Sequence, residues 1–103
     1  MSQEEVLRRI ESDDPGITLL DVREQESYQR SHIPGAILIP RGQLELRVDE
    51  LLPDPTARIV VYCQFGKIST LATATLRDLG FSRAIAMAQG MESWLKKDYP
   101  TIG

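Results

Sequence analysis

Short apolar runs alternate along the chain with amphipathic segments. Four runs have the length and composition of buried strands, and they span residues 17–22, 36–39, 59–62 and 84–88. Apolar positions at helical spacing predict helices around residues 2–10, 24–31, 44–52, 71–79 and 91–95. Because alternating strands and helices require crossover connections, the pattern predicts an α/β fold with a mainly parallel sheet and helices on both faces.

Local signals indicate where several helices begin and end. Ser2 and Glu5 have the spacing of a capping box, so the first helix is expected to begin there. The stretch Asp13-Asp14-Pro15-Gly16 is predicted to end it. Ser69 is predicted to be the N-cap of the helix that follows the third strand, and Gly80 is predicted to end that helix. Residues 98–103 are expected to form an irregular strap.

Length and composition narrow the classes of protein. The 103 residues are expected to form a single domain, 1–103. The net charge of −3 and the absence of a basic stripe argue against a nucleic-acid partner. No apolar run reaches the roughly 18 residues of a membrane span, and the N-terminus does not have the pattern of a signal peptide. A single cysteine cannot form an internal disulfide, which favours a reducing, cytoplasmic compartment. One cysteine and one histidine also argue against a structural metal site, and no cofactor is expected. The oligomeric state stays open.

Cys63 is the main candidate for chemistry. It follows the apolar run 59–62 directly, and ligands of parallel sheets gather at the carboxyl ends of strands. A loop that leads into a helix directs backbone N–H groups and partial positive charge toward such a position, which favours a thiolate. Gly66 suits the backbone of such a cradle, and Lys67 adds a positive charge. By residue type alone, a cysteine after a buried strand is more often a small core residue, and the helix start with Gly66 and Lys67 makes the two interpretations equal.

Three segments, in this order, resemble signatures of the rhodanese-like domain family. The first combines Asp21-Val22-Arg23-Glu24, Tyr28 and His32-Ile33-Pro34-Gly35-Ala36. The second is the loop Cys63-x-x-Gly66, between a hydrophobic strand and a helix. The third joins Leu79-Gly80-Phe81 to Gly90-Met91-Glu92-Ser93-Trp94-Leu95. The resemblance covers about residues 2 to 100 and implies a three-layer fold with a five-stranded, mainly parallel sheet.

The resemblance also implies a reaction, the transfer of sulfane sulfur. Cys63 would be the nucleophile that takes this sulfur from thiosulfate or a persulfide donor. The resulting persulfide would pass the sulfur to a thiol, to cyanide or to a protein acceptor. The substrate-binding loop implied by the family is Gln64, Phe65, Gly66, Lys67, Ile68 and Ser69, supported by Asp21 and Arg23 at a strand end. We expect these last two residues to form a structural brace.

The chain departs from the family pattern at three positions. Many members carry Arg directly after the cysteine and again five residues after it, where this chain has Gln64 and Ile68. Arg grips oxyanions with two parallel hydrogen bonds, whereas Lys67 offers a point charge, so we expect modest affinity for thiosulfate. Gln89 stands where the closing segment often has its first glycine. This third difference concerns backbone conformation more than chemistry.

Two other functions compete with sulfur transfer. One is a non-catalytic rhodanese-like binding or regulatory module, either a free protein or part of a longer chain. Phe65 is relevant to this hypothesis, because an aromatic side chain at the tip of a loop either packs into the core or is exposed for contact with a partner protein. The other is a phosphatase or arsenate reductase of related loop architecture, which needs Arg six positions after the cysteine, where Ser69 stands. His32 is expected to be a structural turn element.

Overall fold

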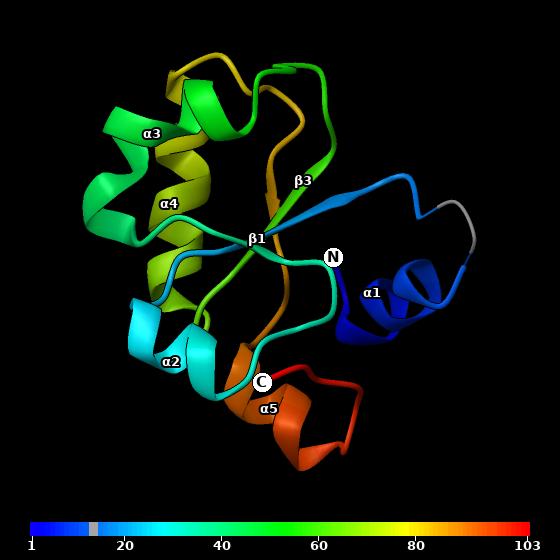
Figure 1. Cartoon of the computed structure of the whole chain (residues 1–103). Coiled ribbons are helices and arrows are strands. Elements are labelled where there is room, and N and C mark those ends of the chain that lie inside the picture. Colours follow the sequence, from blue (N-terminus) through cyan, green and yellow to red (C-terminus); the bar gives the residue numbers. More distant parts are fainter. Residues whose placement is uncertain (13–14) are drawn as a thin grey trace.

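The computed structural model describes residues 1–12 and 15–103, and a parallel sheet runs through its centre (Figure 1). The four strands lie in the order β2-β1-β3-β4. Their bounds are Thr18–Asp21 (β1), Ile37–Leu38 (β2), Ile59–Tyr62 (β3) and Ile85–Ala86 (β4). All three pairings are parallel. Each strand lies within an apolar run of the sequence, and β3 coincides with its run.

Helices cover both faces of the sheet. They are α1 (Gln3–Ile10), α2 (Gln25–Arg30), the 3-10 helix η1 (Arg41–Gln43), α3 (Leu44–Leu51), α4 (Lys67–Asp78) and α5 (Met91–Lys96). In Figure 1, α3 and α4 lie on one face and α1 and α5 on the other. In the described ranges, no helix is long and apolar enough to cross a membrane.

The first helix begins as the sequence predicts. The Ser2 side chain accepts a hydrogen bond from the amide of Glu5, with an N···O distance of 3.1 Å. This bond satisfies one of the free N–H groups at the helix start. The helix ends at Ile10, and two members of the predicted stop signal, Asp13 and Asp14, lie outside the described residues.

The expectation of a five-stranded sheet is wrong for the described part of the chain, where the sheet has four strands. Met1 alone lies where a fifth strand would pair with β4. Its ammonium group donates to the carbonyl of Ala86 (2.8 Å), and its own carbonyl accepts from the amide of Ala88 (2.7 Å). Because helix α1 is capped by the next residue, Ser2, the pairing stops after one residue.

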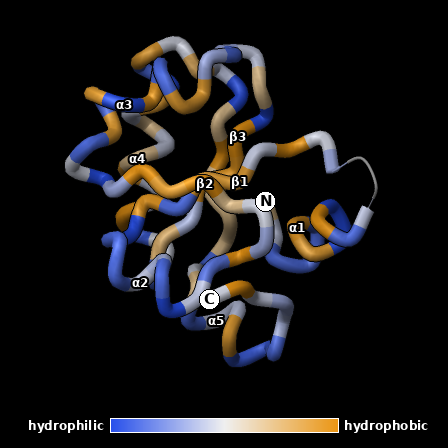
Figure 2. Tube along the Cα trace, in the orientation of Figure 1, coloured by the Kyte–Doolittle hydropathy of each residue, from blue (hydrophilic) through white to orange (hydrophobic). Residues whose placement is uncertain are grey.

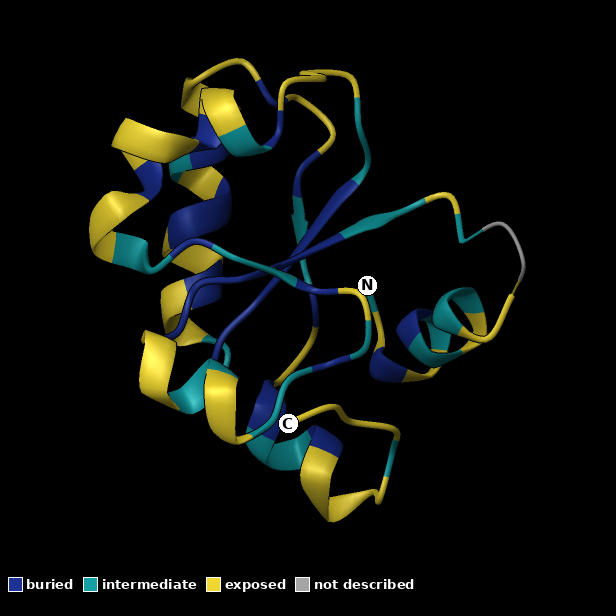
Figure 3. Cartoon of the chain, viewed as in Figure 1, coloured by how far each residue is buried: buried dark blue, intermediate teal, exposed yellow. Residues whose placement is uncertain are grey.

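The core consists of two apolar clusters, one on each face of the sheet. Along β3, Ile59 and Val61 belong to the cluster beneath α3 and α4, and Val60 and Tyr62 belong to the cluster that includes Trp94 of α5. Side chains of a strand alternate between faces, so a strand covered on both sides is apolar throughout. Figures 2 and 3 show this central band as hydrophobic and buried, with hydrophilic, exposed helix surfaces outside it.

Two leucines on helices test this description of the core. Leu76 of α4 is fully buried, whereas Leu46 of α3 is 85% exposed. Leu76→Ala is expected to lower the free energy of unfolding by about 2–5 kcal/mol, because it removes packed methyl groups and leaves a cavity. Leu46→Ala is the matched control and should change it by less than about 0.5 kcal/mol. Urea denaturation of both variants measures the difference, and equal midpoints would contradict the packing.

Candidate active site

The sulfur of Cys63 lies in a ring of hydrogen-bond donors immediately after β3. The amides of Gly66 and Ser69 donate to Sγ at N···S distances of 3.1 and 3.2 Å. The thiol also hydrogen-bonds to the hydroxyl of Ser69, with Sγ and Oγ 3.4 Å apart. The residue is only 3% exposed. The buried sulfur therefore faces polar groups, as expected for a reactive cysteine and not for one sealed in apolar packing.

These contacts set the acidity of the thiol. Burial alone raises the pKa of Cys63, because it removes water from the charged form. The hydroxyl of Ser69 and the amides of Ser69, Gly66 and Phe65 oppose this effect, since they donate to the thiolate. The hydrogen bonds outweigh burial, so the pKa of Cys63 lies below that of an ordinary thiol. A lower pKa increases the fraction of nucleophilic thiolate at neutral pH.

A glycine in the left-handed region starts the next helix early. Gly66, at φ +106°, is the N-cap of α4, so the prediction that Ser69 is the N-cap is wrong. The tight turn places Ser69 in the first helical turn, where its amide has no partner within the helix and donates to the sulfur of Cys63. A Cβ on Gly66 would also lie 2.7 Å from the carbonyl oxygen of Gln89. Gln89 itself is left-handed, at φ +62°, a conformation that glycine adopts more readily.

The start of α5 holds the cysteine loop in this orientation. The amide of Met91 donates to the carbonyl of Cys63 (2.8 Å), and the amide of Glu92 donates to the carbonyl of Gln64 (3.1 Å). The backbones approach so closely that a Cβ on Gly90 would lie 2.3 Å from the Gln64 oxygen. Because α5 binds the loop carbonyls, the loop amides are left to face the sulfur.

Asp21 and Arg23 form the expected brace at the end of β1. The guanidinium of Arg23 donates to both carboxylate oxygens of Asp21 at 2.8–3.1 Å, and both side chains are buried. The same guanidinium donates to the carbonyl of Ser31 (2.7 Å) and, at 3.4 Å, to the side-chain oxygen of Gln64. The ion pair therefore links β1, the end of α2 and the cysteine loop.

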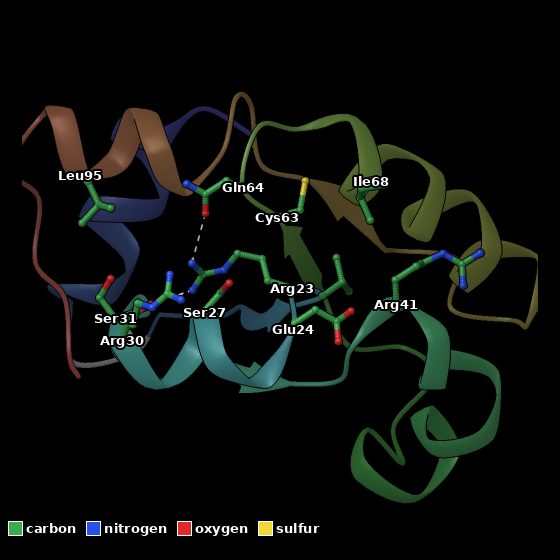
Figure 4. A pocket seen from close by; sticks show the side chains of 11 residues that line it. Arg23, Glu24, Ser27, Arg30, Ser31, Arg41, Cys63, Gln64, Ile68 and Leu95 are labelled. Atoms are coloured by element: carbon green, nitrogen blue, oxygen red, sulfur yellow. Dashed lines mark hydrogen bonds between the residues drawn. The ribbon is translucent and has the colours of Figure 1, made fainter.

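A cavity of about 510 Å³ opens beside Cys63 (Figure 4). Its lining comes from the end of β1, from α2, η1 and α5, and from the cysteine loop and the start of α4: Val22, Arg23, Glu24, Ser27, Arg30, Ser31, Arg41, Cys63, Gln64, Ile68 and Leu95. Cys63, whose sulfur accepts hydrogen bonds from backbone amides, therefore lines a cavity large enough for a small-molecule ligand.

The structure separates the predicted loop residues into three groups. Gln64 and Ile68 line the cavity. Gly66 and Ser69 contact the sulfur and lie outside the lining. Phe65 and Lys67 have exposed side chains, and neither residue lines the cavity.

Sequence reasoning missed two arginines of the lining. Arg30 is the last residue of α2, and Arg41 is the first residue of η1. These two elements therefore bring positive charge to the cavity, whereas the cysteine-loop positions that line it hold the uncharged Gln64 and Ile68. Both elements follow the carboxyl ends of strands, β1 and β2, which is where ligands of parallel sheets gather. Applying this rule to β1 and β2 as well as to β3 would have pointed to the segments that carry these residues, but not to the individual arginines.

The structure also shows the surroundings of His32 and Phe65. His32 stacks on the ring of Tyr28, with centroids 3.7 Å apart, and its Nδ1 lies 2.9 Å from the Tyr28 carbonyl oxygen. It does not line the cavity, which agrees with a structural role. Phe65 is 69% exposed, so the option that it packs inward is wrong.

Comparison with known proteins identifies the family. The model of the rhodanese-like domain matches residues 2–97. The putative sulfur carrier protein YrkF of Bacillus subtilis is 36% identical over 97 residues, which cover 94% of this chain and 51% of YrkF. The chain therefore spans about half the length of that relative.

Two other proteins are similar over more of their own length. The thiosulfate sulfurtransferase GlpE of Coxiella burnetii is 31% identical over 85 residues, which cover 82% of this chain and 77% of GlpE. The crystal structure of the Alr3790 protein from Anabaena sp. superposes with a TM-score of 0.92 at 29% identity. That superposition covers all of this chain and 81% of the Alr3790 chain, so the same fold extends over the whole of this chain.

The brace predicts a large loss of stability when one partner is removed. Arg23→Ala leaves the fully buried carboxylate of Asp21 without its counter-charge, so it should lower the free energy of unfolding by about 3–5 kcal/mol. Arg8→Ala, which breaks an exposed ion pair with Glu5, is the control and should cost less than about 1 kcal/mol. Urea denaturation compares them, and similar midpoints would refute a brace.

The donor ring predicts the pH dependence of alkylation. Ser69→Ala removes the hydroxyl that donates to the thiolate, so the pKa of Cys63 should rise and less thiolate should be present at neutral pH. The midpoint of the iodoacetamide rate against pH should therefore move upward. Thr56→Ala is the control, because its hydroxyl bonds to the side chain of Asp54, outside the cysteine loop and α4. An unmoved midpoint in Ser69→Ala would contradict the assignment.

Proposed function

We infer that this protein transfers sulfane sulfur through a persulfide on Cys63, since the chain belongs to the rhodanese-like domain family. The observation that carries the proposal is the ring of donors around a sulfur that lies at the wall of a cavity. Relatives described as a sulfur carrier and as a thiosulfate sulfurtransferase support the same reaction class. The proposed donors are thiosulfate or a persulfide.

The first half of the reaction moves one sulfur onto the enzyme. The Cys63 thiolate attacks the outer sulfur of the donor and forms a new S–S bond. The bond between that sulfur and the rest of the donor breaks, and its electron pair leaves with sulfite or with the donor's thiolate. The product is a Cys63 persulfide anion. The amides of Gly66 and Ser69, fixed before the reaction, stabilise negative charge at this position.

The second half returns the enzyme to its starting state. An acceptor nucleophile attacks the terminal sulfur, and the electron pair of the S–S bond returns to the Cys63 thiolate. Because Cys63 is the only cysteine of the chain, no internal thiol can resolve the persulfide. The acceptor is therefore external: a thiol, cyanide or a protein.

A second candidate is a rhodanese-like module that binds a partner without catalysis. Phe65, Ile68 and Leu71 are all substantially exposed at the cysteine loop and the start of α4, which supports contact with another protein. An intact donor ring is unnecessary for such a role. A protein that gains no sulfur yet binds one specific partner would favour this candidate.

Mass spectrometry tests the transfer directly. After incubation with thiosulfate or an organic persulfide, the intact protein is expected to gain one sulfur atom, and cyanide should remove it. Cys63→Ala should gain none under the same conditions, because it lacks the nucleophile. An equal gain in Cys63→Ala, or no gain in the native protein with any donor, would end the proposal.

A further inference from the structure

A group of hydrogen-bond donors on and next to α2 faces the same cavity as Cys63. The group consists of Ser27, Arg30 and Ser31, which lie on one side of the cavity in Figure 4. Within the described ranges, neither the guanidinium of Arg30 nor the two hydroxyls form a hydrogen bond or ion pair with the protein. Three unpaired donor groups in the lining of one cavity favour the binding of an anion there.

The other charged groups of the lining are occupied or lie apart from this group. Arg23 is neutralised by Asp21. Arg41 forms an ion pair with Glu45 and also bonds to Thr75. Glu24, the one carboxylate that the described part of the chain contributes to the lining, lies on the side of Arg41 and away from Arg30 in Figure 4. Arg30 is therefore the lining residue whose positive charge is free for a ligand.

The position of this charge discriminates between donors. In thiosulfate, the negative sulfonate is bonded directly to the sulfur that is transferred, so its counter-charge must lie next to Cys63. The lining residues nearest to Cys63 in sequence are Gln64 and Ile68, which carry no charge. Arg30 projects from a different element, across the cavity in Figure 4, and suits an anionic group separated from the reacting sulfur by an organic body.

We propose that Arg30, with Ser27 and Ser31, binds a carboxylate of a small organic persulfide that presents its outer sulfur to Cys63. The proposal rests on the sulfur transfer proposed above and names its donor class. The cavity of about 510 Å³ is in the range that holds organic ligands of moderate size, and Val22, Ile68 and Leu95 provide apolar contacts for the body. The Cys63 thiolate takes the outer sulfur, the donor's S–S bond breaks, and its electron pair leaves on the donor's thiolate.

Rates of sulfur transfer from two matched donors test the proposal. Glutathione persulfide carries two carboxylates, and its diethyl ester carries none. Arg30→Ala should slow transfer from the parent about five- to tenfold, as expected for one lost charge-assisted hydrogen bond at a half-open site, and leave transfer from the ester unchanged. Arg47→Ala, an exposed arginine of α3 outside the lining, should change neither rate. Equal effects of Arg30→Ala on both donors, or no effect, would overturn the proposal.

Binding of an unreactive analogue separates this proposal from the transfer reaction. S-methylglutathione keeps both carboxylates and cannot give up sulfur. Calorimetry should show that it binds the native protein and that Arg30→Ala weakens binding about five- to tenfold, with partial recovery in Arg30→Lys. Binding that depends on Arg30 without any sulfur transfer would refute the proposed function and retain the anion site. No binding to the native protein would refute the anion site.

Discussion

The orientation of a few peptide groups between β3 and α4 is the constraint on which the site depends. The carbonyls of Cys63 and Gln64 bind the first amides of α5, so the amides of Gly66 and Ser69 remain available for the sulfur. Neither set of hydrogen bonds involves a side chain donor or acceptor other than the sulfur itself. The site is therefore built mainly from backbone, and its accuracy depends on how closely α5 packs on the loop. Gly90 permits that approach because a side chain there would meet the Gln64 carbonyl.

Ser69 adds a side chain that can serve both protonation states of the cysteine. While the thiol is protonated, its S–H donates to the Ser69 hydroxyl, which donates to the carbonyl of Gly66 at 3.0 Å. When the thiol ionises, the same hydroxyl can turn and donate to the sulfur. The Gly66 carbonyl keeps a partner in that state, because the hydroxyl of Thr70 also donates to it at 2.8 Å. Ionisation thus leaves no buried polar group unpaired, which keeps its cost low.

The sequence predicted the parts of this arrangement that follow from local patterns. Continuous apolar character located β3, and the position of Cys63 after it indicated the reactive loop. Ser69 was wrongly predicted to be the N-cap of α4, because serine favours N-caps in general. Gly66, at φ +106°, starts the helix earlier. The fifth strand was expected from the family resemblance, but among the described residues the pairing at its place is limited to Met1. Arg30 was overlooked because its role arises from the distance across the cavity, which no spacing within the sequence expresses.

The amides that surround the Cys63 sulfur and the proposed anion-binding residues Ser27, Arg30 and Ser31 lie on different elements. This separation has a consequence for which sulfur donors the protein would accept. In the proposed reaction the donors around Cys63 act on the transferred sulfur, which is common to all sulfane-sulfur donors, so they cannot distinguish one donor molecule from another. In the proposed complex the cavity wall contacts the remainder of the donor, and apart from Cys63, Gln64 and Ile68 the lining residues lie outside the cysteine loop, at the end of β1 and on or next to α2, η1 and α5. Substitutions in those elements can change which donor binds while the geometry around Cys63 stays as it is, because the loop is held by backbone bonds to α5. The absence of arginine at positions 64 and 68 is therefore compatible with the proposed sulfur transfer: the positive charge proposed to select the donor lies on α2, whereas the amides proposed to stabilise a persulfide lie in the cysteine loop and at the start of α4.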